Sequence, residues 1–282
     1  MWRTHFNVAW VFLLNQEDNE HWNLSDFAWA STQSLYLVNI VNKTSIKHHQ
    51  EASSGQYQRL RLVHETPTSF VSSTSSFGFT IRATQLLMTC IMGIRKLACD
   101  IEEEGDVNII DDAVNDLYSR LEACRESQVK GHTTNEIDYV AISKGDRIAW
   151  YHLNAFIAAA RIYLHRTIFD LPPGSDIIKN YVGEVFENVE SFLKAGGGNF
   201  SLWPAFIAAV EANEVQHIDT AKKWLDFARS VGMDNRFKVK AIVEEVWRLR
   251  ENLSKETGTN SGDISVDWRD VMVDLDFDIL FT

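Results

Sequence analysis

Two histidines on one predicted helix are the first candidates for proton-transfer chemistry. His152 and His165 lie 13 residues apart in the largely apolar run 147–169. Because an α-helix turns by about 100° per residue, the two side chains sit roughly 220° apart around its axis, and one pocket could use only one of them. Either histidine, with Tyr163 or Glu211 beside it, would suffice for a cofactor-independent isomerase or cyclase. A core histidine held by hydrogen bonds is the more frequent situation, so an enzyme is not the favoured interpretation.

The sequence contains no recognisable metal or phosphate motif. None of the nine histidines pairs with another histidine or a carboxylate at the spacing of a helical metal-ligand motif. Glycines 196–198 follow no predicted strand and precede no Lys-Ser or Lys-Thr pair, so they are expected to end a helix. No cofactor and no metal ion are therefore expected. The three cysteines are too few and too far apart for a zinc cluster or a disulfide scaffold: Cys90, Cys99 and Cys124.

Aromatic residues in or beside predicted helices are candidates for an apolar ligand pocket. Large aromatic side chains at helix junctions usually belong to the core. They can also line a pocket between helices, where apolar ligands bind. The core interpretation is favoured, and the pocket interpretation stays open. The five residues concerned are Trp150, Trp203, Phe206, Trp247 and Trp268.

The spacing of apolar residues predicts helices along most of the chain. The clearest case is the 4-3-4-3 repeat of Ile110, Val114, Leu117, Leu121 and Cys124. No stretch alternates polar and apolar residues convincingly, as a half-buried strand would, and the chain contains only 4 prolines and 14 glycines. We therefore expect an all-α fold, an irregular multi-helix bundle of antiparallel helical hairpins.

A single domain is expected over residues 1–282, with two less regular segments. Residues 43–76 are rich in Ser, Thr, His and Gln and have few apolar positions, which predicts a long polar surface loop. Residues 273–282 combine Asp with aromatic residues, and this segment is expected to be a mobile acidic tail.

Acidic residues are concentrated in two segments. The chain has 27 Lys+Arg and 39 Asp+Glu, a formal net charge of −12. Residues 100–116 contain eight acids and no Lys or Arg, and residues 263–282 contain six Asp and one Arg, so the remainder is close to neutral. Without a basic stripe, direct nucleic-acid binding is not expected. The longest uncharged stretch in the central apolar segment, between Arg82 and Arg95, is too short to cross a membrane.

The C-terminal half carries an ordered set of motifs. Residues 202–212 (LWPAFIAAVEA) are followed by 221–224 and Gly232, then by 243–247 (VEEVW) and 267–272 (DWRDVM). This set resembles the fungal-specific transcription factor domain that follows zinc binuclear cluster DNA-binding motifs. The resemblance implies an all-helical regulatory domain of a fungal nuclear regulator, with no known catalytic residues. Upstream segments similar to the same family are 2–5, 77–80 and 159–166 before 171–172.

The cysteine cluster of that family is missing from this chain. A zinc binuclear cluster needs six cysteine ligands, whereas this chain has three cysteines and none before Cys90. The favoured hypothesis is an effector domain that senses or relays a metabolic signal and contacts the transcription machinery or a second copy. The alternative is a stand-alone paralogue that binds or transforms a small apolar metabolite in secondary metabolism. A third, less favoured hypothesis is a scaffold that binds partner helices through its surface grooves. No signal peptide is visible, so a nuclear or cytoplasmic location is expected.

Overall fold

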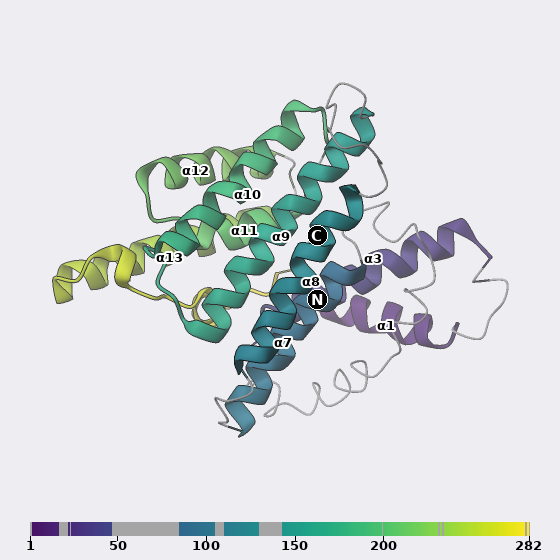
Figure 1. Ribbon diagram of the computed structural model, residues 1–282, viewed down its shortest axis with the longest axis horizontal. Coiled ribbons are helices and arrows are strands. Elements are labelled where there is room, and N and C mark those ends of the chain that lie inside the picture. Colours follow the sequence, from purple (N-terminus) through teal and green to yellow (C-terminus); the bar gives the residue numbers. More distant parts are fainter. Residues whose placement is uncertain are drawn as a thin grey trace.

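All regular secondary structure in the described part of the chain is helical. It contains ten α-helices and one short 3-10 helix, with no strand among the described residues, which confirms the all-α prediction (Figure 1). None of the described helices is both long and apolar enough to cross a bilayer. The computed structural model describes residues 2–16, 22, 24–46, 85–104, 110–129, 143–198, 200–230, 232, 234–279 and 281.

Helix α9 (Lys144–Phe169) is the centre of the fold. Every residue from His152 to His165 is buried, so this helix has neighbours on all sides. Its first turn is capped by the side chain of Ser143, and it ends at Asp170, whose φ of 44° is left-handed. After this turn the chain reverses, and α10 (Asp176–Lys194) packs along α9 as the second half of an antiparallel hairpin (Figure 1).

Two groups of helices cover this hairpin. Helices α7 (Gln85–Glu104) and α8 (Ile110–Val129) pack against each other and against α9. The face predicted from the 4-3-4-3 repeat is the buried face of α8. The second group consists of α11 (Leu202–Glu211), α12 (Val215–Ser230) and α13 (Asp234–Thr257).

Glycines make two of the connections possible. The end of α10 is closed by Gly196, which has a φ of 79°, and by a hydrogen bond from Gly197 N to Phe192 O of 2.9 Å. This confirms the helix-end prediction for glycines 196–198. At the α9–α10 turn, Gly174 N donates to Gly262 O at 2.6 Å, and a Cβ atom on Gly174 would lie only 2.8 Å from that oxygen.

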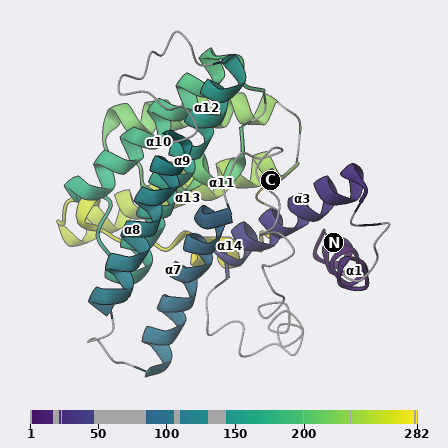
Figure 2. The same cartoon turned by 45° about the vertical axis from the view of Figure 1, so that its right-hand side comes forward.

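The N-terminal helices form a smaller cluster at one edge of the molecule. Helix α1 (Trp2–Leu14) packs on α3 (Asp26–Lys43), and α3 in turn contacts α7 (Figure 2). Trp10 of α1 is buried against Tyr36 of α3.

The segment after α13 crosses back over the molecule. It contains the 3-10 helix η3 (Ser261–Asp263) and helix α14 (Trp268–Asp274). The side chains of Ile279 and Phe281 are buried, and Phe281 N donates to Asn42 Oδ1 of α3 at 3.0 Å. In the structure the acidic segment 273–282 is therefore packed at these positions; its mobility in solution stays a prediction.

The polar loop predicted at 43–76 falls mostly outside the described residues. Lys43 is the last residue of α3, and Thr44 and Ser45 continue from it as a buried turn. Residues 47–76 are not described, so the prediction of a loop applies to them unchanged.

Candidate functional site

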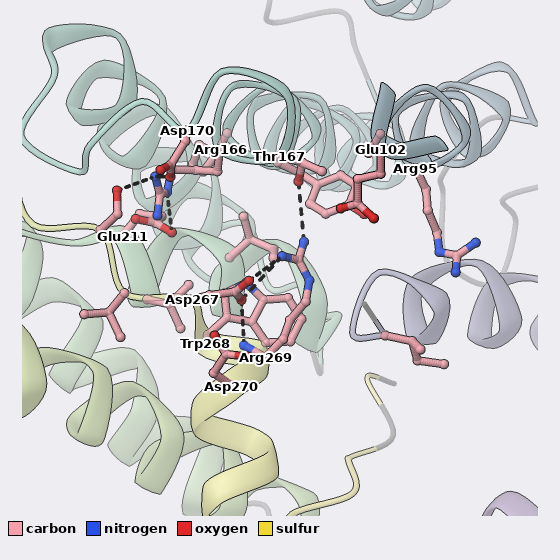
Figure 3. Close-up of a pocket in the computed structure, with 18 of the residues that line it drawn as sticks. Arg95, Glu102, Arg166, Thr167, Asp170, Glu211, Asp267, Trp268, Arg269 and Asp270 are labelled. Atoms are coloured by element: carbon pink, nitrogen blue, oxygen red, sulfur yellow. Dashed lines mark hydrogen bonds and ion pairs between the residues drawn. The ribbon is translucent and has the colours of Figure 1, made fainter. Parts of the chain in front are cut away.

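A pocket of about 480 Å³ lies between α7, α9, α11 and the segment that leads into α14 (Figure 3). Its size falls within the range of small-molecule sites. Its apolar lining comes mainly from Ile46, Ala98, Ile162, Tyr163, Ile207, Val210, Val266 and Trp268. Its charged lining consists of Arg95, Glu102, Arg166, Asp170, Glu211, Asp267, Arg269 and Asp270.

One wall of the pocket is built around Glu211, the last residue of α11. Its side chain is only 3% exposed and forms two ion pairs, from Oε1 to Arg166 Nε and from Oε2 to Arg250 Nη2, both of 3.0 Å. The Nη1 atom of Arg166 also donates to Asp170 Oδ1 at 2.8 Å and to the carbonyl oxygen of Leu171 at 2.7 Å. The end of α9 is thus tied to α11 and α13 through charged groups.

The pKa values of the two arginines that pair with Glu211 shift in opposite directions. Burial lowers the pKa of Arg250, and Glu211 only partly opposes this effect. Burial also lowers the pKa of Arg166, but Glu211 and Asp170 outweigh it and the net pKa is raised. Both oxygens of Glu211 are already engaged by guanidinium groups, so this carboxylate is poorly placed to act as a general base toward a ligand.

A second wall is organised by Arg269 in the first turn of α14. Its Nε donates to the carbonyl oxygen of Thr44 at 2.9 Å, and its Nη1 pairs with Asp267 Oδ2 at 3.1 Å. The guanidinium lies over the rings of Trp268 and Tyr163, with its carbon 5.1 and 5.7 Å from their centroids. Burial lowers the pKa of Arg269, but Asp267 and Tyr163 raise it further, so the group stays charged. Figure 3 shows this guanidinium in the middle of the pocket wall.

The two candidate histidines do not line this pocket. His152 lies at a hydrogen-bond distance of 2.9 Å from Ser201 Oγ, and its ring packs against Phe156, Phe192 and Phe200. It has the surroundings of a core histidine.

His165 belongs to a separate cluster between α8, α9 and α10. Its Nε2 is hydrogen-bonded to the hydroxyl of Tyr118, and its ring stacks on Tyr181. Burial, with a smaller contribution from Arg161, lowers the pKa of His165. Burial, with a contribution from Tyr181, raises the pKa of Tyr118 to about 12. Of the four proton-transfer candidates, Tyr163 and Glu211 line the pocket and the histidines do not.

Most of the candidate pocket aromatics are core residues. Trp268 lines the pocket, whereas the others do not. Trp203 is 1% exposed, stacks on Phe156 and donates to Thr44 Oγ1 at 2.9 Å. Phe206 is fully buried against Trp268. Trp247 donates to the carbonyl oxygen of Ala209, and Trp150 is half-buried on α9.

Comparison with known proteins assigns the chain to a family. The family model of the fungal specific transcription factor domain matches residues 1–282. The chain belongs to this family. No curated protein and no solved structure matches it. The resemblance seen in the motif order is thus confirmed over the whole length of this fungal transcription factor domain.

The arginines of the pocket in this fungal transcription factor domain were not predicted from the sequence. Arg161 and Arg166 interrupt the mostly apolar second half of α9, and a largely enclosed guanidinium needs a counter-charge. These two arginines are a signal in the sequence, although they do not reveal which carboxylate is the partner of Arg166. Among the described residues, no group of three His, Cys, Asp or Glu could hold a metal ion.

Proposed function

We propose that this chain is the effector domain of a fungal transcription regulator and that its pocket binds the small molecule to which the regulator responds. Family membership supports the regulatory role. The observation that carries the sensing role is the pocket of about 480 Å³ beside Glu211. A nuclear location and a connection with secondary metabolism belong to the same proposal.

The construction of the pocket supports a role in signalling. Arg269 of α14 contacts the carbonyl oxygen of Thr44 after α3 and the ring of Tyr163 on α9. A ligand in the pocket would touch segments that are far apart in the sequence, so it would favour one arrangement of these segments over others. That preference is what a sensor needs in order to alter contacts elsewhere.

An enzymatic role for the same scaffold has weaker support. Tyr163 and Glu211 line one pocket, as an isomerase or cyclase would require of an acid and a base. Glu211, however, is already paired with Arg166 and Arg250. The residues of the pocket are therefore better suited to binding than to proton transfer.

Protein contacts are the second part of the proposal. Val8, Val11 and Phe12 follow helical spacing on α1 and are 66%, 58% and 50% exposed. Helix α1 contains no acid, and its cationic groups are confined to Arg3 and His5. Copies of a chain with a net charge of −12 repel each other, so association is most favourable through an uncharged apolar face. The occupant we propose for this face is the same face of a second copy.

The regulatory role is tested by tethering the domain to a foreign DNA-binding module in a fungal reporter strain. We expect the folded domain to change reporter output several-fold. Unchanged output from a folded, nuclear fusion would overturn the proposed function.

The sensing role is tested by filling the pocket in the same fusion. Ala98 is a half-buried lining residue of α7, so Ala98→Trp places an indole in the cavity. We expect the reporter output of this variant to differ from that of the parent fusion. Lys96→Trp is the matched control because Lys96 is exposed on the same helix and does not line the pocket. Equal output from both variants would contradict a sensing pocket.

A further inference from the structure

The charged groups of the pocket are arranged so that its guanidinium groups are enclosed. Arg95 is 8% exposed, and its Nε donates to the carbonyl oxygen of Lys43 at 3.0 Å. The side chains of Arg166 and Arg269 are 12% and 14% exposed and hold the carboxylate partners described above. An anionic ligand would have to compete with carboxylate and carbonyl oxygens that are already in place.

The exposed charges of the pocket are carboxylates. Glu102 lies in the last turn of α7, Asp170 caps the end of α9, and Asp270 lies in the first turn of α14. All three are exposed, Asp170 at 77% although its Oδ1 also pairs with Arg166 at 2.8 Å, and they come from three separate elements (Figure 3). With Glu211 and Asp267, the described residues of the lining comprise five carboxylates against three guanidinium groups. A cleft with an excess of one sign of charge concentrates ligands of the opposite sign.

The rest of the lining is suited to an apolar body. Ile162 of α9 and Ile207 and Val210 of α11 are buried residues that line the pocket. Apolar side chains of this kind bind hydrocarbon or aromatic groups, whereas a few polar groups fix the orientation of a ligand. The pocket therefore combines an apolar interior with an acidic rim.

We propose that this pocket binds a small cationic amphiphile, a protonated amine carried on a hydrocarbon or aromatic body. The ammonium group faces the rim formed by Glu102, Asp170 and Asp270, and the body lies against the aliphatic side chains. The choice of site rests on the proposed sensing function, whereas the class of ligand rests on the charges and the apolar lining.

The test uses the purified chain and three probes that share one phenylpropyl body: 4-phenylbutylamine, 4-phenylbutanamide and 4-phenylbutyrate. They carry a positive, a neutral and a negative head group. Isothermal titration calorimetry measures their affinities. We expect the amine to bind about tenfold more tightly than the amide, and the butyrate to bind most weakly. Because the rim is exposed, higher salt should weaken binding of the amine more than that of the amide.

Cys99 reports where the probe binds. This half-buried thiol lines the pocket, whereas Cys90 and Cys124 are fully buried. Alkylation of the native protein with N-ethylmaleimide, followed by mass spectrometry, should label Cys99 first. We expect 4-phenylbutylamine to slow this labelling at concentrations that match its calorimetric affinity.

Two sets of variants test the acidic rim. The double variant Glu102→Gln with Asp270→Asn should weaken binding of the amine about tenfold and leave that of the amide unchanged. The double variant Asp111→Asn with Asp112→Asn is the matched control, because these are exposed acids of α8 that do not line the pocket and their loss changes the net charge by the same amount. Tighter binding of the butyrate, equal binding of all three probes, or no binding at all would overturn the proposed ligand class.

The reporter experiment separates this inference from the proposed function. An active tethered domain whose pocket rejects the amine refutes the ligand class while the regulatory role stands. Tight binding of the amine that protects Cys99, combined with an inactive tethered domain, supports the ligand class and refutes the regulatory role.

Discussion

Glu211 and Arg250 form an ion pair of 3.0 Å in which each side chain is only 3% exposed. They come from α11 and α13, 39 residues apart, and Arg166 of α9 completes the group on the other oxygen of the carboxylate. Burying two guanidinium groups against one carboxylate is costly unless the carboxylate stays in place. The stability of three helices therefore depends on a single acidic residue.

Replacing that residue should destabilise the domain strongly. We expect Glu211→Gln to lower the free energy of unfolding by about 3–5 kcal/mol, measured by urea denaturation, because the buried Arg250 loses its carboxylate partner and Arg166 keeps only the exposed Asp170. Arg250→Met should lower the free energy of unfolding by less, because Glu211 still forms its ion pair with Arg166. Glu214→Gln serves as the control: Glu214 is 40% exposed beside Lys179, and its loss should cost at most about 1 kcal/mol. A smaller loss for Glu211→Gln than for Arg250→Met would contradict this account.

The close approach of Gly174 to Gly262 predicts a second sensitive position. A Cβ atom on Gly174 would lie 2.8 Å from a backbone oxygen, so Gly174→Ala must push the segment around Gly262 away from the α9–α10 turn. We expect a loss of about 1–3 kcal/mol in the free energy of unfolding. Gly198→Ala is the control, because no atom lies within 4 Å of the added methyl group. Equal stabilities of the two variants would show that the turn adapts.

The buried His165 predicts a pH dependence of stability. Its pKa is lowered by burial in the folded protein and returns toward 6.5 on unfolding. The unfolded state therefore binds more protons as the pH falls through 6.5, and the free energy of unfolding decreases there by at most about 1.4 kcal/mol per pH unit. Urea denaturation between pH 7.5 and 5 should show a shallower decline for His165→Gln than for the parent. His5→Gln, at an exposed position, should leave the decline unchanged.

The exposed face of α1 predicts self-association. We expect the chain to form dimers at micromolar concentration in size-exclusion chromatography with light scattering. Phe12→Asp should weaken the dimer at least about tenfold by placing two carboxylates in the apolar contact. Leu253→Asp, at a position of α13 that is 38% exposed, should leave the dimer intact. A parent protein that stays monomeric at high concentration, or a dimer insensitive to Phe12→Asp, would exclude this face.

Local sequence patterns predicted the helices but not the pocket. The repeat from Val114 to Cys124 identified the buried face of α8, because helical periodicity depends on neighbouring residues. The partners of Glu211 could not be deduced in the same way, because nothing in the local sequence specifies which of many arginines comes within 3 Å. Of the predicted pocket aromatics, Trp268 lines the cavity, whereas Trp203 fills the core. Because tryptophan serves in both roles, the residue type alone does not distinguish a pocket residue from a core residue.

The contacts made by the last helix determine when the fold can be completed. Arg269 reaches the carbonyl oxygen of Thr44 across 225 residues, and Phe281 N reaches Asn42 across 239 residues. Contacts between such distant parts of a chain form late, since the intervening chain must be ordered first. During synthesis the carbonyl oxygen of Thr44 and the side-chain oxygen of Asn42 therefore have no hydrogen bond from this segment until Arg269 and Phe281 have left the ribosome. A chain synthesised only as far as α13 therefore lacks the wall of the pocket that Asp267, Trp268 and Arg269 form.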